Sequence, residues 1–185
     1  MPSNRREFLR QTAGAALAAP FFVRDLISKP PSNTLRVAAF GADGMAYYTL
    51  DGVGRHSKAA IACVAEVDTA RMEKVKQKYP KAKLYQDWRE MLRKEKGNFD
   101  GACVGTPDHM HAAMAMSVMR MGLPVYCQKP LAHSIYEVRR LTEYARQKKL
   151  ATQMGIQIHS AREYKTAVKL IQAGAIGKVK EVHSW

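Results

Sequence analysis

A lysine followed by a proline stands at the end of a short apolar run in the middle of the chain. The run between Gly122 and Pro130 has the length of a buried strand, and Lys129 comes directly before the proline. Open α/β sheets bind their ligands just beyond the carboxyl ends of parallel strands. Lys129 is therefore predicted at the edge of a site, although a solvated loop lysine before a strand-ending proline would give the same pattern.

A glycine-containing turn follows an apolar segment at residues 35–40 and would open a helix. Backbone N–H groups at such a turn, together with the positive end of the helix dipole, can bind a phosphate. One position departs from the dinucleotide fingerprint, because an aspartate stands where the close approach of the pyrophosphate favours glycine. Its carboxylate would repel phosphate unless it turns away or the next glycine takes over the contact. An ordinary strand–turn–helix explains the glycines equally well. The candidate cofactor residues here are Gly41, Asp43, Gly44, Met45 and Ala46.

An acidic residue ends the next apolar segment, about twenty residues beyond the glycines. Glu66 follows the run that begins at Ile61, where a carboxylate can accept hydrogen bonds from the ribose of an adenosine. Asp68 lies just behind it and could instead cap the helix that begins near Thr69. A carboxylate at this place suits two ribose hydroxyls and repels a 2′-phosphate, which predicts NAD over NADP. Arg71 could reverse that preference by pairing with the phosphate.

A turn with two histidines follows the predicted strand at residues 100–104. Each histidine taken alone fits a surface position or a helix start, and the nearby methionines fit core packing. His109 and His111 are only two residues apart and have no obvious third ligand, so a metal site is not predicted.

Strand-like and helix-like segments alternate from Leu35 onward, which predicts βαβ units and a doubly wound parallel α/β sheet. The predicted strands are at about 35–40, 59–66, 82–85, 100–104, 124–127 and 151–154. The predicted helices are at about 44–54, 68–79, 87–95, 109–121, 134–148 and 161–173.

The composition is that of a globular protein of 185 residues with a formal net charge of +14. The basic residues recur at helical spacing among acids, as in Arg71–Lys83 and Arg139–Lys149, which predicts solvated helix faces rather than a nucleic-acid partner. No apolar run approaches the length of a membrane span. Cys63, Cys103 and Cys127 each fall in a predicted strand, which favours apolar packing over disulfides.

The first residues differ in character from the rest. Arg5 and Arg6 precede an alanine-rich, weakly apolar run and a small-x-small site at Ala16 to Ala18. This layout resembles a twin-arginine export signal, and an amphipathic terminal helix is the alternative. Residues 1–31 are therefore predicted to be an export signal and linker, which places the mature protein in the periplasm.

Four further motifs occur in a set order along the chain: Thr106 to His111, Tyr126 to Leu131, Gln153 to Gly155 and Gly174 to Val179. Their order and spacing resemble the glucose–fructose oxidoreductase, inositol dehydrogenase and rhizopine catabolism (Gfo/Idh/MocA) family. The resemblance implies a Rossmann-type NAD(P)-binding domain at residues 32–155. It also implies that residues 156–185 hold a crossover helix and the first strand of a second α+β domain that is otherwise missing.

The resemblance implies roles for two turns. In the family a Thr-Pro-x-x-x-His turn lies along the cofactor, and a Glu-Lys-Pro turn brings its lysine to the nicotinamide and the substrate oxygen. The residues so implicated here are Thr106, Pro107, His111, Gln128, Lys129 and Pro130, with Lys129 as the catalytic one.

Three departures from the family pattern stand out. Gln128 replaces a glutamate, which keeps a hydrogen-bonding group beside Lys129 but removes a negative charge. Asp43 stands at a glycine position. Glu181 to Trp185 resembles the first strand of the second domain, cut off as it starts, so the chain is expected to be a truncated fragment.

The implied function is that of an NAD(P)-dependent oxidoreductase acting on a sugar or polyol. A hydride would pass between a substrate carbinol carbon and the nicotinamide, with Lys129 polarising the oxygen and a base of the second domain taking the proton. NAD is the expected cofactor, with NADP as the alternative, and the full-length family member is expected to be a homo-oligomer. Two other functions remain open: an NAD-dependent glycoside hydrolase of the same family, and a non-catalytic nucleotide-binding fragment.

Overall fold

The structure is a computed structural model that describes residues 33–184. The predicted export signal at residues 1–31 lies outside the described residues, as does Trp185. Among the helices of residues 33–184, none combines the length and the apolar character that crossing a membrane requires.

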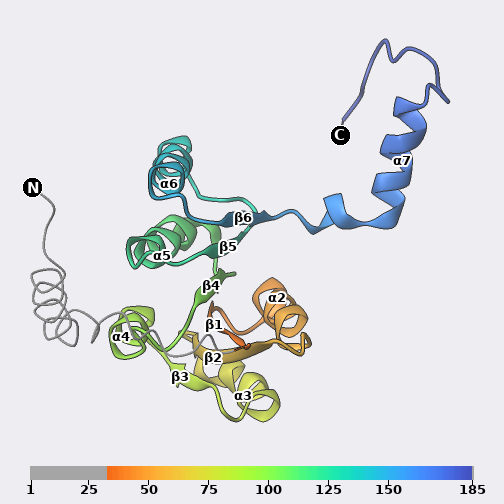
Figure 1. Ribbon diagram of the computed structural model, residues 1–185. Coiled ribbons are helices and arrows are strands. Elements are labelled where there is room, and N and C mark those ends of the chain that lie inside the picture. Colours follow the sequence, from red (N-terminus) through yellow and green to blue (C-terminus); the bar gives the residue numbers. More distant parts are fainter. Residues whose placement is uncertain (1–32, 185) are drawn as a thin grey trace, which may run out of the picture. The chain divides into compact units, whose positions relative to one another are not determined.

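Six parallel strands form one sheet (Figure 1). They are β1 (Leu35–Phe40), β2 (Ala59–Ala65), β3 (Lys83–Tyr85), β4 (Gly101–Val104), β5 (Val125–Gln128) and β6 (Thr152–Gly155). Their order across the sheet is β3-β2-β1-β4-β5-β6. β1 therefore lies between β2 and β4, and the strand order reverses at that point. This arrangement confirms the doubly wound sheet that the alternation of segments predicts.

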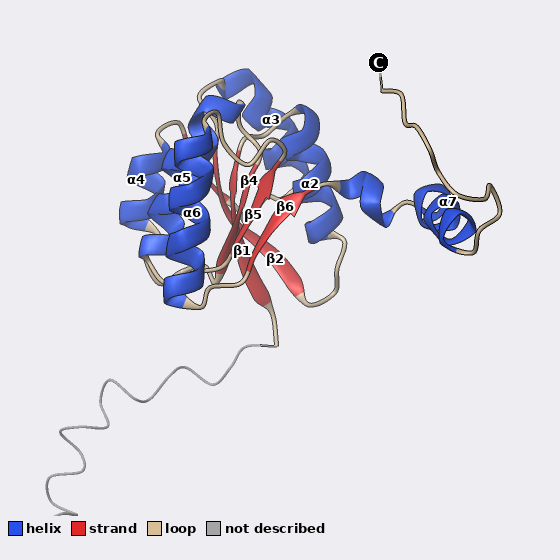
Figure 2. Ribbon diagram, turned by 90° about the horizontal axis from the view of Figure 1, so that it is seen from above, coloured by secondary structure: helices blue, strands red, loops and turns tan. Residues whose placement is uncertain are grey.

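Helices cover both faces of the sheet (Figure 2). They are α2 (Gly44–Gly54), α3 (Thr69–Lys78), α4 (Trp88–Lys94), α5 (Asp108–Arg120) and α6 (Ile135–Lys148). A 3-10 turn, η1 (Gln157–Ser160), and a further helix, α7 (Arg162–Gln172), follow β6 and have no buried residues. One apolar cluster joins α4, α5 and α6 to the sheet, and a second joins α2 and α3 to the opposite face. The helices of the two faces thus bury the sheet between them.

β1 shows why the strands read as almost unbroken apolar runs. Val37 and Ala39 belong to the cluster under α2 and α3, whereas Ala38 and Phe40 belong to the cluster under α4, α5 and α6. Successive side chains of a strand point to opposite faces, and both faces of this sheet are covered. The apolar run is therefore the signature of a strand that is buried on both sides.

The three cysteines lie in the buried strands, as predicted. Cys63 is in β2, Cys103 in β4 and Cys127 in β5, and all three are buried and free.

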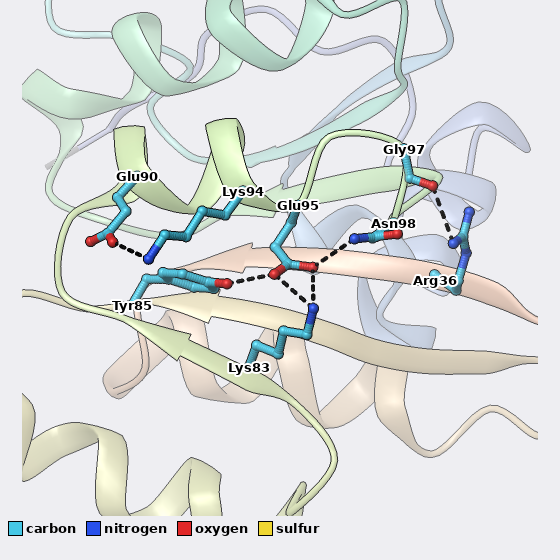
Figure 3. A network of polar contacts seen from close by, with 8 residues as sticks. All are labelled: Arg36, Lys83, Tyr85, Glu90, Lys94, Glu95, Gly97 and Asn98. Atoms are coloured by element: carbon cyan, nitrogen blue, oxygen red, sulfur yellow. Dashed lines mark hydrogen bonds and ion pairs between the residues drawn. The ribbon is translucent and has the colours of Figure 1, made fainter.

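A buried carboxylate holds the β3 edge of the sheet to the end of α4 (Figure 3). Glu95 is 3% exposed, and its carboxylate accepts hydrogen bonds from the Tyr85 hydroxyl, from Lys83 Nζ at 2.9 and 3.0 Å, and from Asn98 Nδ2 at 3.1 Å. Burial alone would raise the pKa of Glu95, but these donors outweigh it and lower the pKa. The hydrogen bond to the carboxylate raises the pKa of Tyr85 to about 12. The network thus keeps a charge on Glu95 inside the protein.

The end of the chain differs from the prediction in one respect. α7 forms where a helix is predicted, but Glu181 to Ser184 have no regular secondary structure and are exposed. A strand needs a neighbouring strand to accept and donate its backbone hydrogen bonds, and within residues 33–184 the sheet ends at β3 and β6 without pairing with this segment. The strand predicted at 181–185 is therefore absent from the described residues.

Candidate dinucleotide site

The candidate site lies where the carboxyl ends of β1 and β4 meet. Phe40, the last residue of β1, pairs with Val104, the last residue of β4. Gly105 N–H then donates to the carbonyl of Phe40 at 2.9 Å, and Gly41 N–H donates to the carbonyl of Ala65 at 2.8 Å. The turns that follow three strands are thereby fixed against one another at the point where open α/β sheets bind ligands.

A cavity of about 670 Å³ opens at this meeting point. Its wall takes residues from the turns after β1, β2, β3 and β4. They include Gly41, Asp43, Ala46, Glu66, Arg71, Trp88, Thr106 and Pro107. A cavity of this size falls in the range that binds cofactors and drug-sized ligands.

The glycine turn is shaped by a close approach of α2 to β4. A Cβ atom added to Gly41 would lie 2.7 Å from Ala46 Cβ, and one added to Gly105 would lie 2.7 Å from Ala46 Cα. Gly41 also has a φ of +98°, which only glycine adopts freely. Ala46 therefore fills the helix-packing place of the fingerprint, and the two glycines make room for it.

The outer side of the same turn is open. Gly44 has a φ of +53°, and a Cβ atom added there would meet no atom within 4 Å. The N–H groups of Gly44 and Met45 belong to the first turn of α2, so they have no acceptor inside the helix. Asp43 has an extended φ of −136°, and its exposed side chain does not cap α2. Residue 43 needs no glycine for its backbone conformation, and Asp43 is among the residues that line the cavity.

Glu66 is tied to the glycine turn. Its Oε2 accepts a hydrogen bond from Ala42 N–H at 2.9 Å, and its Oε1 accepts one from Asp68 N–H at 3.1 Å. Asp68 itself caps α3 by accepting from Ala70 N–H at 2.9 Å, and it pairs with Arg71 at 3.2 Å. The structure thus brings Glu66 to the wall of the cavity, whereas Asp68 holds the start of a helix, which was the alternative for that residue.

The Thr-Pro turn contributes both to the cavity wall and to the interior. Thr106, Pro107 and His109 line the cavity. His111 is 1% exposed, with Nε2 at 2.7 Å from the carbonyl oxygen of Thr106 and Nδ1 at 2.7 Å from that of Pro130. His111 therefore joins two backbone turns from within the protein.

Lys129 lies directly beyond the carboxyl end of β5. Its side chain is exposed, and within residues 33–184 it takes part in none of the ion pairs. The Lys129–Pro130 peptide bond is cis. Gln128 is 5% exposed and donates from Nε2 to Thr49 Oγ1 at 2.8 Å. Lys129 is thus exposed to solvent, while the side chain of the residue before it and the carbonyl of the residue after it are hydrogen-bonded to α2 and to His111.

Local sequence patterns do not identify some residues of the site. Thr49 on α2 bonds to a residue 79 positions away, and no local pattern marks it. Gln86, Trp88 and Arg89 line the cavity from beyond β3, a strand of three residues that carries no ligand motif. The described residues hold no group of three or more histidine, cysteine, aspartate or glutamate side chains that could bind a metal ion.

The geometry defines a class of protein. A glycine turn at the switch point, a carboxylate after the second strand and a cavity that spans both are the features of a Rossmann-type dinucleotide-binding domain. More particularly, the chain belongs to the family GFO_IDH_MocA, described as "Oxidoreductase family, NAD-binding Rossmann fold", whose match covers residues 35–156.

Several proteins of known name are similar to the chain. Inositol 2-dehydrogenase of Corynebacterium glutamicum (strain R) is 26% identical over 150 residues, which cover 80% of this chain and 44% of that protein. Rhizopine catabolism protein MocA of Rhizobium meliloti is 29% identical over 97 residues, covering 52% and 30%. The chain therefore spans less than half the length of these relatives.

Solved structures share the fold. Myo-inositol 2-dehydrogenase from Lactobacillus plantarum superposes with a TM-score of 0.72 at 23% identity, over 79% of this chain and 43% of that one. Scyllo-inositol dehydrogenase from Lactobacillus casei, solved with NAD(H) and scyllo-inositol, gives a TM-score of 0.71 at 18% identity, over 78% and 43%.

Proposed function

We propose that the chain is the cofactor-binding part of an NAD-dependent dehydrogenase that acts on a sugar or polyol. The observation that carries the proposal is the glycine turn at the switch point, where Gly41 and Gly105 make room for Ala46 while the outer face at Gly44 stays open. A pyrophosphate fits there against the N–H groups of the first turn of α2. The relatives named as inositol dehydrogenases support the substrate class.

Each part of the site has a role in this proposal. The N–H groups at Gly44 and Met45 bind the pyrophosphate, and Glu66 accepts hydrogen bonds from the adenosine ribose. Thr106 and Pro107 line the cavity along which the cofactor would extend toward residues 128–130, the lysine turn. Bound NAD supplies the hydride acceptor. Lys129 orients and polarises the substrate oxygen, and its position past the end of β5 supports this role.

The proposal extends to export and assembly. Arg5 and Arg6, ahead of a weakly apolar run, support translocation of the folded protein to the periplasm by the twin-arginine route. The complete protein is proposed to be a homo-oligomer.

Titration of the purified chain with NADH and NADPH tests the cofactor assignment. Energy transfer from tryptophan to the nicotinamide reports binding, and NADH should bind more tightly, with a dissociation constant on the order of 10 μM because Asp43 opposes the phosphates. Failure of both dinucleotides to bind at millimolar concentration would refute the proposal. Tighter binding of NADPH would refute the preference for NAD.

Two glycine variants test whether NADH binding depends on the glycine turn rather than on α2 as a whole. Gly105→Ala places a Cβ atom 2.7 Å from Ala46 Cα and should weaken NADH binding at least about tenfold by displacing the turn. Gly52 lies on α2, and the Cβ atom of Gly52→Ala meets no atom within 4 Å, so this variant should leave binding unchanged. Equal binding by the two variants would show that the turn does not hold the cofactor.

A further inference from the structure

The lysine turn lies between side chains from two helices, one on each face of the sheet. Lys129 is exposed, but the residue before it, Gln128, is 5% exposed and reaches α2. The carbonyl of the residue after it, Pro130, is held by His111 of α5. An exposed lysine on a free loop would have neither anchor.

The first anchor is a directed chain of hydrogen bonds. Thr49 Oγ1 donates its single proton to the carbonyl of Met45 at 2.9 Å, so toward Gln128 it can only accept. Gln128 Nε2 supplies the donor at 2.8 Å. The space around the amide is also restricted, because a Cβ atom added to Gly155 would lie 2.8 Å from Gln128 Oε1.

This direction accounts for the amide at position 128. A glutamate would bring an ionised carboxylate, which only accepts, so Thr49 would have to give up its bond to Met45 in order to donate to it. The glutamine therefore matches Thr49, and the resulting bond links the lysine turn to the helix whose first turn begins at Gly44, next to the glycine turn.

The second anchor is the ring of His111, which spans 2.7 Å to the carbonyl oxygen of Thr106 and 2.7 Å to that of Pro130. Both oxygens can only accept, so the doubly protonated ring donates to both, whereas the neutral ring donates to one of them. The doubly protonated ring therefore ties the Thr-Pro turn to the lysine turn, whereas the neutral ring bonds to only one of the two turns.

We propose that Gln128 and Thr49, together with His111, are positioning residues that fix Lys129 relative to the nicotinamide end of the cofactor. This inference rests on the proposed function for its cofactor part. Its structural part, the anchoring of the lysine turn, concerns the chain alone. Neither Gln128 nor His111 lines the cavity at the glycine turn, which agrees with a role in holding the turn rather than in contacting the adenosine half.

The structural part is tested on the cofactor-free chain by ¹⁵N relaxation of the Lys129 and Leu131 amides. Wild type and Thr49→Ser, which keeps the hydroxyl, should give order parameters near about 0.85, while Thr49→Val and Gln128→Met should fall below about 0.6. The double variant Thr49→Val, Gln128→Met should be no more mobile than either single one, because both remove the same bond.

Thr166→Val is the matched control, since Thr166 Oγ1 donates to the carbonyl of Arg162 at 2.9 Å in the same manner on α7. It should leave both amides unchanged. Unchanged order parameters in Thr49→Val and Gln128→Met would refute the anchor, and so would an equal loss in the Thr166 control. His111→Phe tests the second anchor in the same way, provided that circular dichroism shows a native fold. If His111→Phe does not fold, the two milder variants decide the proposal.

The cofactor part is tested with NADH against ADP-ribose, which lacks the nicotinamide. Thr49→Val and Gln128→Met should weaken NADH about fivefold, the worth of one hydrogen bond, and ADP-ribose less than about twofold. Thr49→Ser should bind both ligands as wild type does. Equal weakening of both ligands would show a general structural defect and refute the positioning role. If wild type bound neither ligand, the proposed function and with it the positioning role would fail, while the relaxation data would still decide the anchor.

Discussion

Glu66 has little freedom to turn away from the cavity. Both of its oxygens accept backbone hydrogen bonds, from Ala42 and from Asp68. The carboxylate is therefore fixed beside the glycine turn in the absence of any ligand, and its charge is present before a cofactor arrives. A fixed negative charge beside the ribose opposes a 2′-phosphate more strongly than a mobile one.

Glu66→Gln should narrow the preference for NADH over NADPH by about tenfold, because it removes one like charge from beside the 2′-phosphate. The amide oxygen can still accept from Ala42 N–H, so the bond to the glycine turn is kept, whereas the amide NH2 faces Asp68 N–H and that bond is lost. Dissociation constants for both dinucleotides measure the ratio. Glu73→Gln serves as the control, since the exposed Glu73 carboxylate on the same helix, α3, pairs with Lys76 outside the cavity and should leave the ratio nearly unchanged. A ratio that changes equally in both variants would contradict the assignment of Glu66.

Single residues differ in how far the sequence predicts their place. The spacing of Glu66 from the glycines follows from the length of one βα unit, so its position on the cavity wall could be predicted. The partners of His111 could not, because they are backbone carbonyls of turns whose distance in space depends on the packing of α5. The same holds for Thr49, whose partner lies in another strand.

At the scale of elements, the strands and helices begin and end within about two residues of the predicted bounds, since buried apolar runs and helix caps mark them directly. Ser134, for example, forms a capping box with Glu137 at the start of α6. The prediction of a strand at residues 181–185 is wrong for the described part of that segment, because residues 181–184 form no strand. Its apolar alternation indicates a strand, but pairing depends on a neighbour that local sequence does not specify.

β1 and the segment before β4 are joined by an ion pair that depends on pH. Asp100 accepts from Arg36 Nη2 at 2.6 Å, Nε at 3.1 Å and the backbone N–H at 2.9 Å. The hydrogen bond from the Arg36 side chain, with the backbone bond and the positive charge, lowers the pKa of Asp100 although burial opposes it. In the unfolded chain the pKa returns to about 3.9. The unfolded state therefore binds the proton first, and the stabilisation is lost as the pH falls through the folded pKa.

Asp100→Asn should lower the free energy of unfolding by about 1 kcal/mol at pH 7, a discounted value because both side chains are about one third exposed. The difference between variant and wild type should shrink as the pH falls below about 4, where wild type also loses the charge. Urea unfolding at pH 7 and pH 3 measures it. Glu143→Gln, whose exposed pair with Arg140 lies on α6, is the control for loss of a surface charge. A difference that stays constant with pH would contradict this account.

At the scale of the whole molecule, the strand order follows from the alternation of segments and from the right-handed connection between parallel strands. These rules leave few alternatives to the observed order, and the position of the crevice follows from the reversal of the order at β1. What the rules do not give is the size of the cavity, which depends on side chains from four separate turns.

The proposed export concerns the whole chain and rests on its first residues. Replacing Arg5 and Arg6 by lysine should leave the protein in the cytoplasm, because the twin-arginine route reads the guanidinium pair and not charge alone. Fractionation of cells that express the double variant measures its location. Replacing Lys29 by arginine keeps the charge and serves as the control. Accumulation of the double variant in the periplasm at the wild-type level would contradict the proposal.

The buried thiols have a consequence for the chemistry of the folded chain. Burial raises the pKa of Cys63 to about 12, of Cys103 to about 11 and of Cys127 to about 12. Alkylating reagents and disulfides react with the thiolate, so all three sulfurs are unreactive at neutral pH while the fold is intact. In the unfolded chain they regain an ordinary pKa and become open to oxidation.

Maleimide labelling should therefore follow unfolding. In native buffer none of the three thiols should be modified within minutes, and in 6 M urea all three should be modified, as intact-mass spectrometry can count. Modification of a cysteine in native buffer, at a rate that urea does not increase, would contradict the burial of that strand. Since the three thiols lie in β2, β4 and β5, their separate rates would show whether the two halves of the sheet open together or one before the other. The three native thiols thus serve as internal probes of the order in which the strands of the sheet become exposed to solvent.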